Sequence, residues 1–220
     1  MREWIVHEDP GFFVVNKPAG VLSQKDKSGD DDLASLIQKD FANGGAALSF
    51  LAPVHRLDRN TSGLIILAKS SDAARELTDW LQEKKIQRTY LAIVKGDPGE
   101  KGRYEYRLRK NEKTNEVFVD DKGDAVITEF TRERKMGNSS LVRVKLVTGK
   151  SHQIRVHFAH AGHALLGDRK YAKKPWSEIF LRPALHSAVL EMPEPCRIKR
   201  FEAKLPKDMQ ELLRKLSGKG

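Results

Sequence analysis

The stretch HRLDRNTSGLIILAK, residues 55–69, joins a charged, turn-forming segment to an unbroken run of apolar residues. The apolar part, residues 64–68, has the length of a strand that is buried on both faces and is too short for an ordinary helix. Asp58 lies between two arginines just before this run, on a loop that the strand would hold in place. Binding and catalytic groups favour such loops, so this stretch is the first candidate for a functional site.

The residues on either side of this stretch predict more strands than helices. Two short apolar runs, residues 4–7 and 12–15, flank an Asp-Pro-Gly turn and predict two adjacent strands. Residues 97–123 predict an exposed hairpin region, and further strands are expected at residues 88–94, 125–135, 140–147, 184–192 and 197–204. Few strand–helix–strand alternations appear, so the predicted fold class is α+β with a largely antiparallel sheet.

Four segments carry the spacing of apolar residues that is typical of amphipathic helices. Helix-capping residues and stop signals set their expected limits. The first helix is expected to start near Leu33, and the second to be capped by Ser71 or Asp72. The third is expected to be capped by Ser151 and to end at Gly162, and the last to begin at Pro206.

The composition indicates a globular chain of 220 residues, with 39% hydrophobic and 32% charged residues. No apolar run approaches the roughly 20 residues of a transmembrane helix, and the N-terminus lacks the apolar core of a signal peptide. A cytoplasmic protein is therefore expected. The single cysteine, Cys196, excludes an intramolecular disulfide, makes a cysteine-based zinc site implausible and predicts a buried, inert thiol.

The charge balance favours a polyanionic partner. Forty Lys and Arg residues against 30 Asp and Glu residues give a formal net charge of +10. An excess of positive charge of this size is typical of proteins that bind nucleic acid, although many basic proteins bind none. The charge alone therefore does not decide between a nucleic-acid enzyme and another basic protein.

Five motifs, in order along the chain, carry a resemblance to a known family. They are NKPAG (16–20), HRLDRNTSGLIILAK (55–69), RTYLAIVKG (88–96), TGKSHQIRVHFAHAGHALLGDRKY (148–171) and LHSAVLEMP (185–193). They resemble the motifs of the RluA-like pseudouridine synthases, the large-subunit ribosomal and tRNA type. The resemblance covers roughly residues 12–193, and five motifs in order are far more specific than any short pattern.

This resemblance implies an RNA-modifying isomerase. The expected fold is a largely antiparallel mixed sheet flanked by helices, with a central active-site cleft. The expected partner is ribosomal or transfer RNA, in which one uridine becomes pseudouridine, and the reaction needs no redox cofactor and no metal. Many family members carry an S4-type RNA-binding domain before the catalytic domain. Because the first motif begins at Asn16, the chain is expected to be a single catalytic domain, residues 1–220, without an S4 domain, and to act as a monomer.

The resemblance also implies roles for individual residues. Asp58 matches the catalytic aspartate, and Arg155 matches an arginine that would pair with it and favour the charged carboxylate. Tyr90 matches a tyrosine whose ring would stack on the flipped uracil and whose hydroxyl would help remove the C5 proton. Arg56 matches an arginine thought to fill the space that the flipped base leaves. The other residues expected to contact the substrate are His55, Thr61, Ile154 and Lys150, which stands where arginine is commoner in the family.

Alternatives remain open at two levels. The carboxylate of Asp58 can attack the sugar, deprotonate C2′ or add to C6 of the base, and the residue type does not discriminate between these routes. Taken one by one, Asp58, Tyr90 and Arg155 also fit a turn cap, a core aromatic residue and a surface phosphate contact. A second hypothesis is a non-catalytic RNA-binding protein or RNA chaperone on the same scaffold.

Two other motifs are rejected as functional sites. His152, His157, His160 and His163 invite a metal site, but their spacing does not place three of them cleanly on one helix face, and RNA contact or a surface position is the better interpretation. Gly149-Lys150-Ser151 resembles the end of a phosphate loop, yet the pattern requires glycine at position 144, where the chain has valine.

Overall fold

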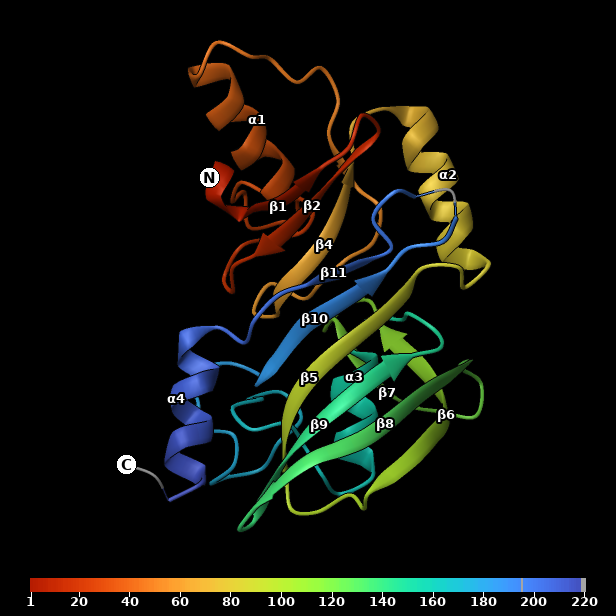
Figure 1. The fold of residues 1–220 in the computed structure, drawn as a ribbon. Coiled ribbons are helices and arrows are strands. Elements are labelled where there is room, and N and C mark those ends of the chain that lie inside the picture. The colour runs from red at the N-terminus through yellow and green to blue at the C-terminus, as the bar shows by residue number, and fades with distance from the viewer. Residues whose placement is uncertain (195, 219–220) are drawn as a thin grey trace. The chain divides into compact units, whose positions relative to one another are not determined.

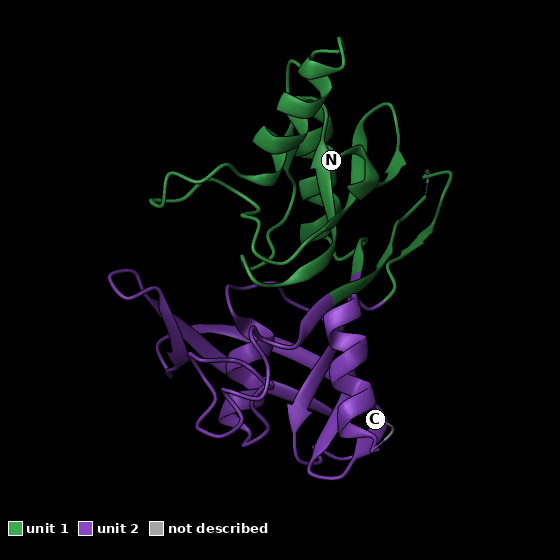
Figure 2. Ribbon diagram, turned by 90° about the vertical axis from the view of Figure 1, so that its left-hand side faces the viewer, with its two compact units in different colours: residues 1–87, 187–204 green, residues 88–186, 205–220 purple. Residues whose placement is uncertain are grey.

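The computed structural model describes residues 1–194 and 196–218, which divide into two compact units. Unit 1 contains Met1–Gln87 and Ser187–Lys204, and unit 2 contains Arg88–His186 and the C-terminal segment from Leu205 (Figure 2). The chain therefore leaves unit 1 after the second helix, builds most of unit 2, and returns to unit 1 near its end. Each unit has its own sheet strands and helices.

β4 is the central strand of unit 1, and all of its residues are buried. Its pairings with β2 and with β3 are antiparallel. β2 pairs with β1 on one side and with β4 on the other, while β3 pairs with β4 and β11 pairs with β10. The bounds are β1 Ile5–Glu8, β2 Phe12–Lys17, β3 Ala52–Pro53, β4 Ser62–Ala68, β10 Leu185–Glu191 and β11 Arg200–Glu202. The predicted N-terminal strand pair and the predicted buried strand are both confirmed.

Helices cover both faces of this small sheet (Figure 1), which is why β4 is apolar at consecutive positions rather than at alternate ones. α2, Ser71–Gln82, packs Leu77 against one face. α1, Leu33–Asn43, covers the other, where Phe41 contacts Phe13 of β2 at 5.7 Å between ring centroids. A short 3₁₀ helix, Arg2–Trp4, precedes β1.

Of the two longer helices of unit 1, one is capped by a residue other than the predicted one. Asp32 caps α1 by accepting a hydrogen bond from the Ser35 backbone N–H at 2.9 Å. At α2 the capping side chain is Ser70, which accepts from the Ala73 N–H at 3.1 Å, so the prediction of Ser71 or Asp72 was wrong by one position. Ser70, Ser71 and Asp72 are all residue types that cap helices, so the sequence does not distinguish between them. Ser70 is the cap because its backbone is extended, as an N-cap residue requires.

Gly63 fixes the start of β4. Its φ is +112°, and a Cβ atom there would lie 2.1 Å from the carbonyl oxygen of Ser187 in β10. Only glycine allows both the backbone angle and this close approach. The Ser187 hydroxyl donates to the carbonyl of Leu64 at 2.9 Å, which joins the two strands directly after the Asp58 loop.

Unit 2 is built on a second antiparallel array of strands, with the order β5-β9-β8-β6-β7. The bounds are β5 Gln87–Lys95, β6 Lys101–Asn111, β7 Glu116–Val119, β8 Asp124–Met136 and β9 Ser139–Leu146. The register of β8 against β9 shifts between Arg132 and Arg134. The hairpin predicted within residues 97–123 is β6–β7, and the pair predicted around Gly137-Asn138 is β8–β9.

One helix packs on each face of the unit 2 strands. α3, Gln153–His160, buries Phe158 against Phe130 and Tyr104 on one face. α4, Lys207–Leu216, covers the other face with Met209 and Leu212. β9 therefore buries residues on both of its faces: Val142 is completely buried, and Leu141, next to it along the strand, packs in the cluster that α4 covers.

Two further predictions concern the chain as a whole. Within the described residues, no helix has the length and apolar character that crossing a membrane requires. Cys196 is only partly buried against the unit 1 core, so the prediction of a buried thiol is confirmed in part. Its burial raises the pKa of the thiol, which makes the thiol less reactive.

Candidate active site

The loop between β3 and β4 carries Asp58, whose side chain is half-buried. The Asp58 carbonyl accepts a hydrogen bond from the Thr61 N–H at 2.9 Å, which closes a tight turn directly before the strand. Arg56 and Arg59 beside it are exposed, whereas Leu57 is buried. The local sequence thus anchors the loop through its apolar residue and leaves its charged residues at the surface.

Contacts on both sides of Asp58 hold this loop. On one side, the buried hydroxyl of Ser23 donates to the Leu57 carbonyl at 2.9 Å and accepts from the Leu57 N–H at 3.1 Å. On the other side, the carbonyl of Arg59 accepts from the Gly20 N–H at 2.9 Å. The Arg59 guanidinium donates back to the Gly20 carbonyl at 3.0 Å and pairs with Asp30 at 2.7 Å. The backbone position of Asp58 is therefore set by both neighbours.

Lys17, at the end of β2, is the central element of this support. Its side chain is completely buried. Its ammonium group donates to three backbone carbonyls, those of Pro18 at 3.0 Å, Val21 at 2.8 Å and Arg59 at 3.0 Å. Three acceptors require three N–H donors, which the ammonium form supplies. Lys17 thus ties the 18–21 turn to the residue that follows Asp58.

The other residues that the sequence assigned to catalysis lie in unit 2. Tyr90 lies on β5, is 4% exposed, and is opposite Val144 of β9 in the strand register. Arg155 lies on α3 and is buried. Asp58 belongs to unit 1, while Tyr90 and Arg155 belong to unit 2.

The start of α3 differs from the prediction, because Ser151 is exposed and does not cap the helix. The N-cap residue is His152, which has a left-handed backbone with φ of 54° and makes no capping hydrogen bond through its side chain. The side chain of Gln153 instead holds the turn that precedes the helix, accepting from the Lys150 N–H and the Thr148 hydroxyl, each at 3.0 Å. The turn before Arg155 is therefore held by a residue inside the helix.

Arg155 forms a bidentate ion pair within unit 2. Its Nε donates to Asp168 Oδ2 at 2.7 Å and its Nη2 donates to Oδ1 at 2.8 Å. The Asp168 side chain is completely buried, and that of Arg155 is 10% exposed. The guanidinium carbon lies 5.0 Å from the centroid of the Tyr171 ring. One edge and one face of the guanidinium are thereby fixed.

The remaining predicted substrate contacts fall into two classes of environment. Arg56 is exposed and so is Lys150, whose ammonium pairs with Asp124 at 2.7 Å and lowers the pKa of that carboxyl. His55, Thr61 and Ile154 are buried, and His55 Nε2 accepts from the Ile66 N–H at 3.3 Å. Their roles in substrate contact stay predictions.

The four histidines of the fourth motif, residues 148–171, do not share one environment. His160 is exposed, and His163 places Nδ1 at 3.0 Å from the Lys95 carbonyl. His157, in contrast, is completely buried, so the prediction of RNA contact or a surface position was wrong for this residue. Its ring packs edge-on against Tyr106 at 5.3 Å between centroids, and Tyr104 lies at 6.4 Å.

We expect His157 to make the fold acid-sensitive. Burial, together with the nearby His160, lowers the pKa of His157 to about 4. In the unfolded chain the imidazole titrates near ~6.5, so the unfolded state takes up the proton first as the pH falls. Stability should therefore decline from about pH 6.5 to about pH 4, by about 3 kcal/mol from this residue.

Urea unfolding of the wild type and of His157→Phe at several pH values tests this expectation. Phenylalanine keeps an aromatic ring among the tyrosines but cannot be protonated, whereas all carboxylates are common to both proteins. The wild type should lose more stability than the variant on acidification. Parallel stability curves would show that His157 titrates as an ordinary histidine.

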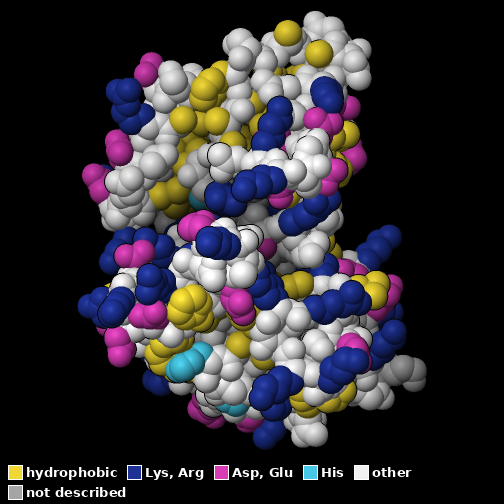
Figure 3. All heavy atoms as spheres, turned by 180° about the vertical axis from the view of Figure 1, so that it is seen from behind, with side chains coloured by type: hydrophobic (Ala, Val, Ile, Leu, Met, Phe, Trp, Pro, Cys, Tyr) yellow, Lys and Arg dark blue, Asp and Glu magenta, His cyan; other side chains and the backbone are white. Residues whose placement is uncertain are grey.

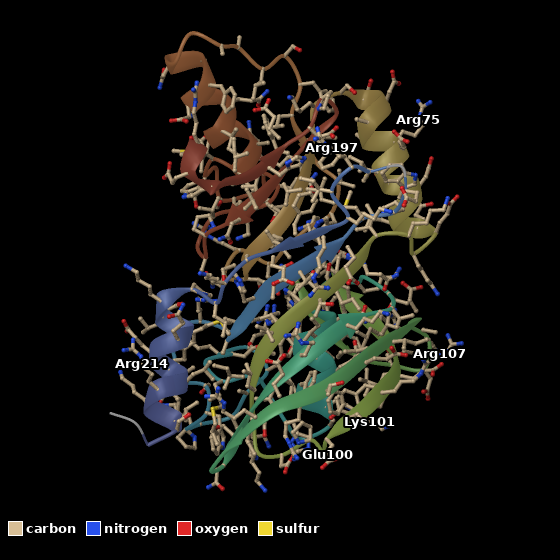
Figure 4. All side chains as sticks on the ribbon, in the orientation of Figure 1. Arg75, Glu100, Lys101, Arg107, Arg197 and Arg214 are labelled. Atoms are coloured by element: carbon tan, nitrogen blue, oxygen red, sulfur yellow. The ribbon has the colours of Figure 1, made fainter. Side chains whose placement is uncertain are left out.

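Charges of both signs cover the surface. On the face shown in Figure 3, Lys and Arg side chains lie among Asp and Glu side chains. Arg103 of β6 pairs with Glu129 of β8 at 3.0 Å, a surface pair of small energetic value. Other cations, including Arg107 on β6 and Arg214 on α4, extend away from the ribbon (Figure 4). Among residues 1–194 and 196–218, no group of three His, Cys, Asp or Glu side chains has the arrangement of a metal site.

Comparisons with known proteins give one consistent family. Residues 11–160 match the family model described as RNA pseudouridylate synthase. The ribosomal large subunit pseudouridine synthase D of Zymomonas mobilis is 34% identical over 96% of this chain and 72% of its own length. The ribosomal large subunit pseudouridine synthase C of Haemophilus influenzae is 35% identical over 98% of this chain and 69% of its own length.

A solved structure shares the fold. Human RNA pseudouridylate synthase domain containing 4 superimposes with a TM-score of 0.81 over 98% of this chain and 93% of its own, at 21% sequence identity. At this level of identity the likeness concerns the fold alone. It confirms the predicted α+β fold of that family.

Proposed function

Because the chain belongs to the RNA pseudouridylate synthase family, we propose that it isomerises a uridine of large-subunit ribosomal RNA to pseudouridine. The enzyme class itself is established by the family: the protein is an RNA pseudouridine synthase of the RluA-like type, an isomerase. The choice of ribosomal RNA rests on the two relatives above, whose names place their substrates in the large ribosomal subunit. Their similarity over nearly the whole chain is the observation that carries the proposal.

The reaction sets the chemical requirements. The C1′–N1 bond breaks, the uracil turns, C1′ bonds to C5, and the proton on C5 leaves while N1 gains one. No atom is added and no electron is transferred, so the demands on the protein are an ionised carboxylate and a pocket that retains the detached base. A uridine inside folded RNA must first be flipped out of its stack to reach such a pocket.

In this proposal Asp58 is the catalytic carboxylate. Its half-buried side chain on a loop fixed at Leu57 and Arg59 suits a group that must keep one position through several steps. Attack on the sugar, deprotonation of C2′ and addition to C6 are all open to a carboxylate. Arg56, exposed on the same loop, would occupy the space left by the flipped base.

Tyr90 and Arg155 complete the proposed active site. Stacking of the Tyr90 ring on the uracil would contribute about 1–3 kcal/mol, and its hydroxyl would assist removal of the C5 proton. Arg155 would be the cationic partner of the Asp58 carboxylate. We propose, as the sequence predicts, that residues 1–220 form one catalytic domain. One chain then carries every catalytic group, which is compatible with a cytoplasmic monomer.

Mapping pseudouridines in total RNA from cells with and without this gene tests the proposal. The expected result is the loss of one or a few pseudouridines from large-subunit ribosomal RNA, restored by the purified protein acting on that RNA. Loss confined to transfer RNA would overturn the proposed substrate. Unchanged maps together with an inactive purified protein would favour a non-catalytic RNA-binding role.

A further inference from the structure

We propose that Asp168 and Tyr171 are positioning residues that fix the guanidinium of Arg155 in its working orientation. This inference rests on the proposed function, in which Arg155 is part of the active site. Both side chains lie at the end of the fourth sequence motif, residues 148–171. The geometry involved lies entirely within unit 2.

The carboxylate of Asp168 is itself immobilised. Its side chain is 0% exposed. Besides the two bonds from Arg155, Oδ1 accepts from the backbone N–H of Lys170 at 3.1 Å and of Tyr171 at 3.3 Å. Because these backbone bonds fix the position of the Asp168 carboxylate, the carboxylate in turn fixes the position of the Arg155 guanidinium.

The Tyr171 ring is held just as firmly. Its hydroxyl oxygen accepts from the Val117 N–H of β7 at 3.0 Å and lies 2.7 Å from His152 Nδ1. Its ring centroid lies 5.0 Å from the Arg155 guanidinium carbon, within the range of a cation–π interaction. The turn 168–171 thus presents a carboxylate to the edge and an aromatic ring to the face of one guanidinium.

The consequence is a preorganised cation. A free arginine side chain samples many rotamers, and this freedom would otherwise have to be lost at each turnover. Two charge-assisted hydrogen bonds through Nε and Nη2 remove this freedom in advance and set the direction of Nη1. The buried carboxylate also balances a cation that would otherwise be buried alone.

Asp168→Asn tests the role of the edge contact. The amide keeps the shape of the side chain but loses its charge and one acceptor. We expect kcat on large-subunit ribosomal RNA to fall by about ten- to a hundredfold, as is typical when an active-site group is slightly misplaced, with KM within about threefold of wild type. A double-mutant cycle gives the decisive readout: in an Arg155→Lys background, Asp168→Asn should lower kcat by less than about threefold, because its effect passes through Arg155.

The matched control is Asp208→Asn in the same unit. Asp208 forms a second bidentate pair, accepting from Arg182 Nε at 2.7 Å and Nη2 at 3.0 Å, on the face covered by α4. Its loss should lower thermal stability while leaving kcat within about threefold. A folded Asp168→Asn protein with wild-type kcat would overturn the inference. So would a double variant in which Asp168→Asn lowers kcat by the same factor in the Arg155→Lys background as in the wild type.

Tyr171→Leu provides a second variant should Asp168→Asn fail to fold. It removes the aromatic face, together with the hydroxyl contacts to Val117 and His152, and leaves the buried ion pair in place. The kcat should therefore fall by about five- to tenfold with little change in KM. Unchanged kcat in this variant counts against the inference. A wild-type protein that forms no pseudouridine in any RNA would instead refute the proposed function, so the two failures are distinguishable.

Discussion

Replacement of Asp58 by asparagine is expected to lower kcat by at least about 10³-fold, because an amide is neither a nucleophile nor a base at neutral pH. The fold should tolerate the change. The contacts that hold the loop involve backbone atoms of Leu57 and Arg59, and the turn at Asp58 is closed by its backbone carbonyl. Thermal unfolding and RNA affinity should therefore stay near their wild-type values.

Release of tritium from RNA labelled at C5 of uridine measures this effect directly, since the C5 proton leaves in every turnover. Asp58→Ala should behave like Asp58→Asn. Asp72→Asn, an exposed aspartate in the first turn of α2, serves as the control and should retain wild-type turnover. Wild-type turnover in either Asp58 variant would end the assignment of the catalytic carboxylate.

The sequence predicted those parts of the fold that depend on patterns of residue type. Residues 64–68 are apolar at consecutive positions, and β4 is indeed covered by helices on both faces. The hairpins of unit 2 follow from strand-forming residues on either side of glycine and asparagine. These features are local, so the neighbouring residues alone specify them.

Features that depend on distant backbone atoms escaped prediction. Ser151 carries the residue type of a cap, but the left-handed backbone of His152 and the side chain of Gln153 decide the helix start. The burial of His157 depends on Tyr104 and Tyr106, roughly fifty residues earlier on β6. The spacing of histidines along the short helix α3 does not indicate that tyrosines of β6 cover one of them.

The supporting residues of the candidate site were missed for the same reason. Asp168 follows Arg155 by 13 positions, and only the turn after α3 brings its carboxylate to the guanidinium. Lys17 bonds to carbonyl oxygens, which every residue possesses and which therefore leave no trace in the sequence. The sequence located residues with reactive side chains but not the backbone that holds them.

Replacement of Lys17 by methionine is expected to have the second largest effect. Methionine preserves the length and most of the volume of the buried side chain, so the loss is confined to the ammonium group. The carbonyls of Pro18, Val21 and Arg59 then lose a donor at a site from which the native side chain is fully excluded from solvent. Unmade hydrogen bonds of this kind cost about 1–3 kcal/mol each, and partial relaxation reduces the sum, so a loss of about 3 kcal/mol is expected.

Activity should fall as well, by at least about tenfold in protein that is still folded, because the Arg59 carbonyl no longer fixes the residue next to Asp58. Urea unfolding and turnover at low temperature, where the variant is folded, measure the two effects separately. Lys69→Met is the matched control, since Lys69, directly after β4, bonds to Glu8 at 2.8 Å and to a single carbonyl, that of Asp9, at 3.2 Å, and its side chain is 19% exposed. A partly exposed ion pair of this kind contributes up to about 1 kcal/mol. If the free energy of unfolding of Lys17→Met lies within about 1 kcal/mol of the wild-type value, the three carbonyl contacts do not stabilise the loop. The position of Asp58 must then depend on Ser23 and Gly20 instead.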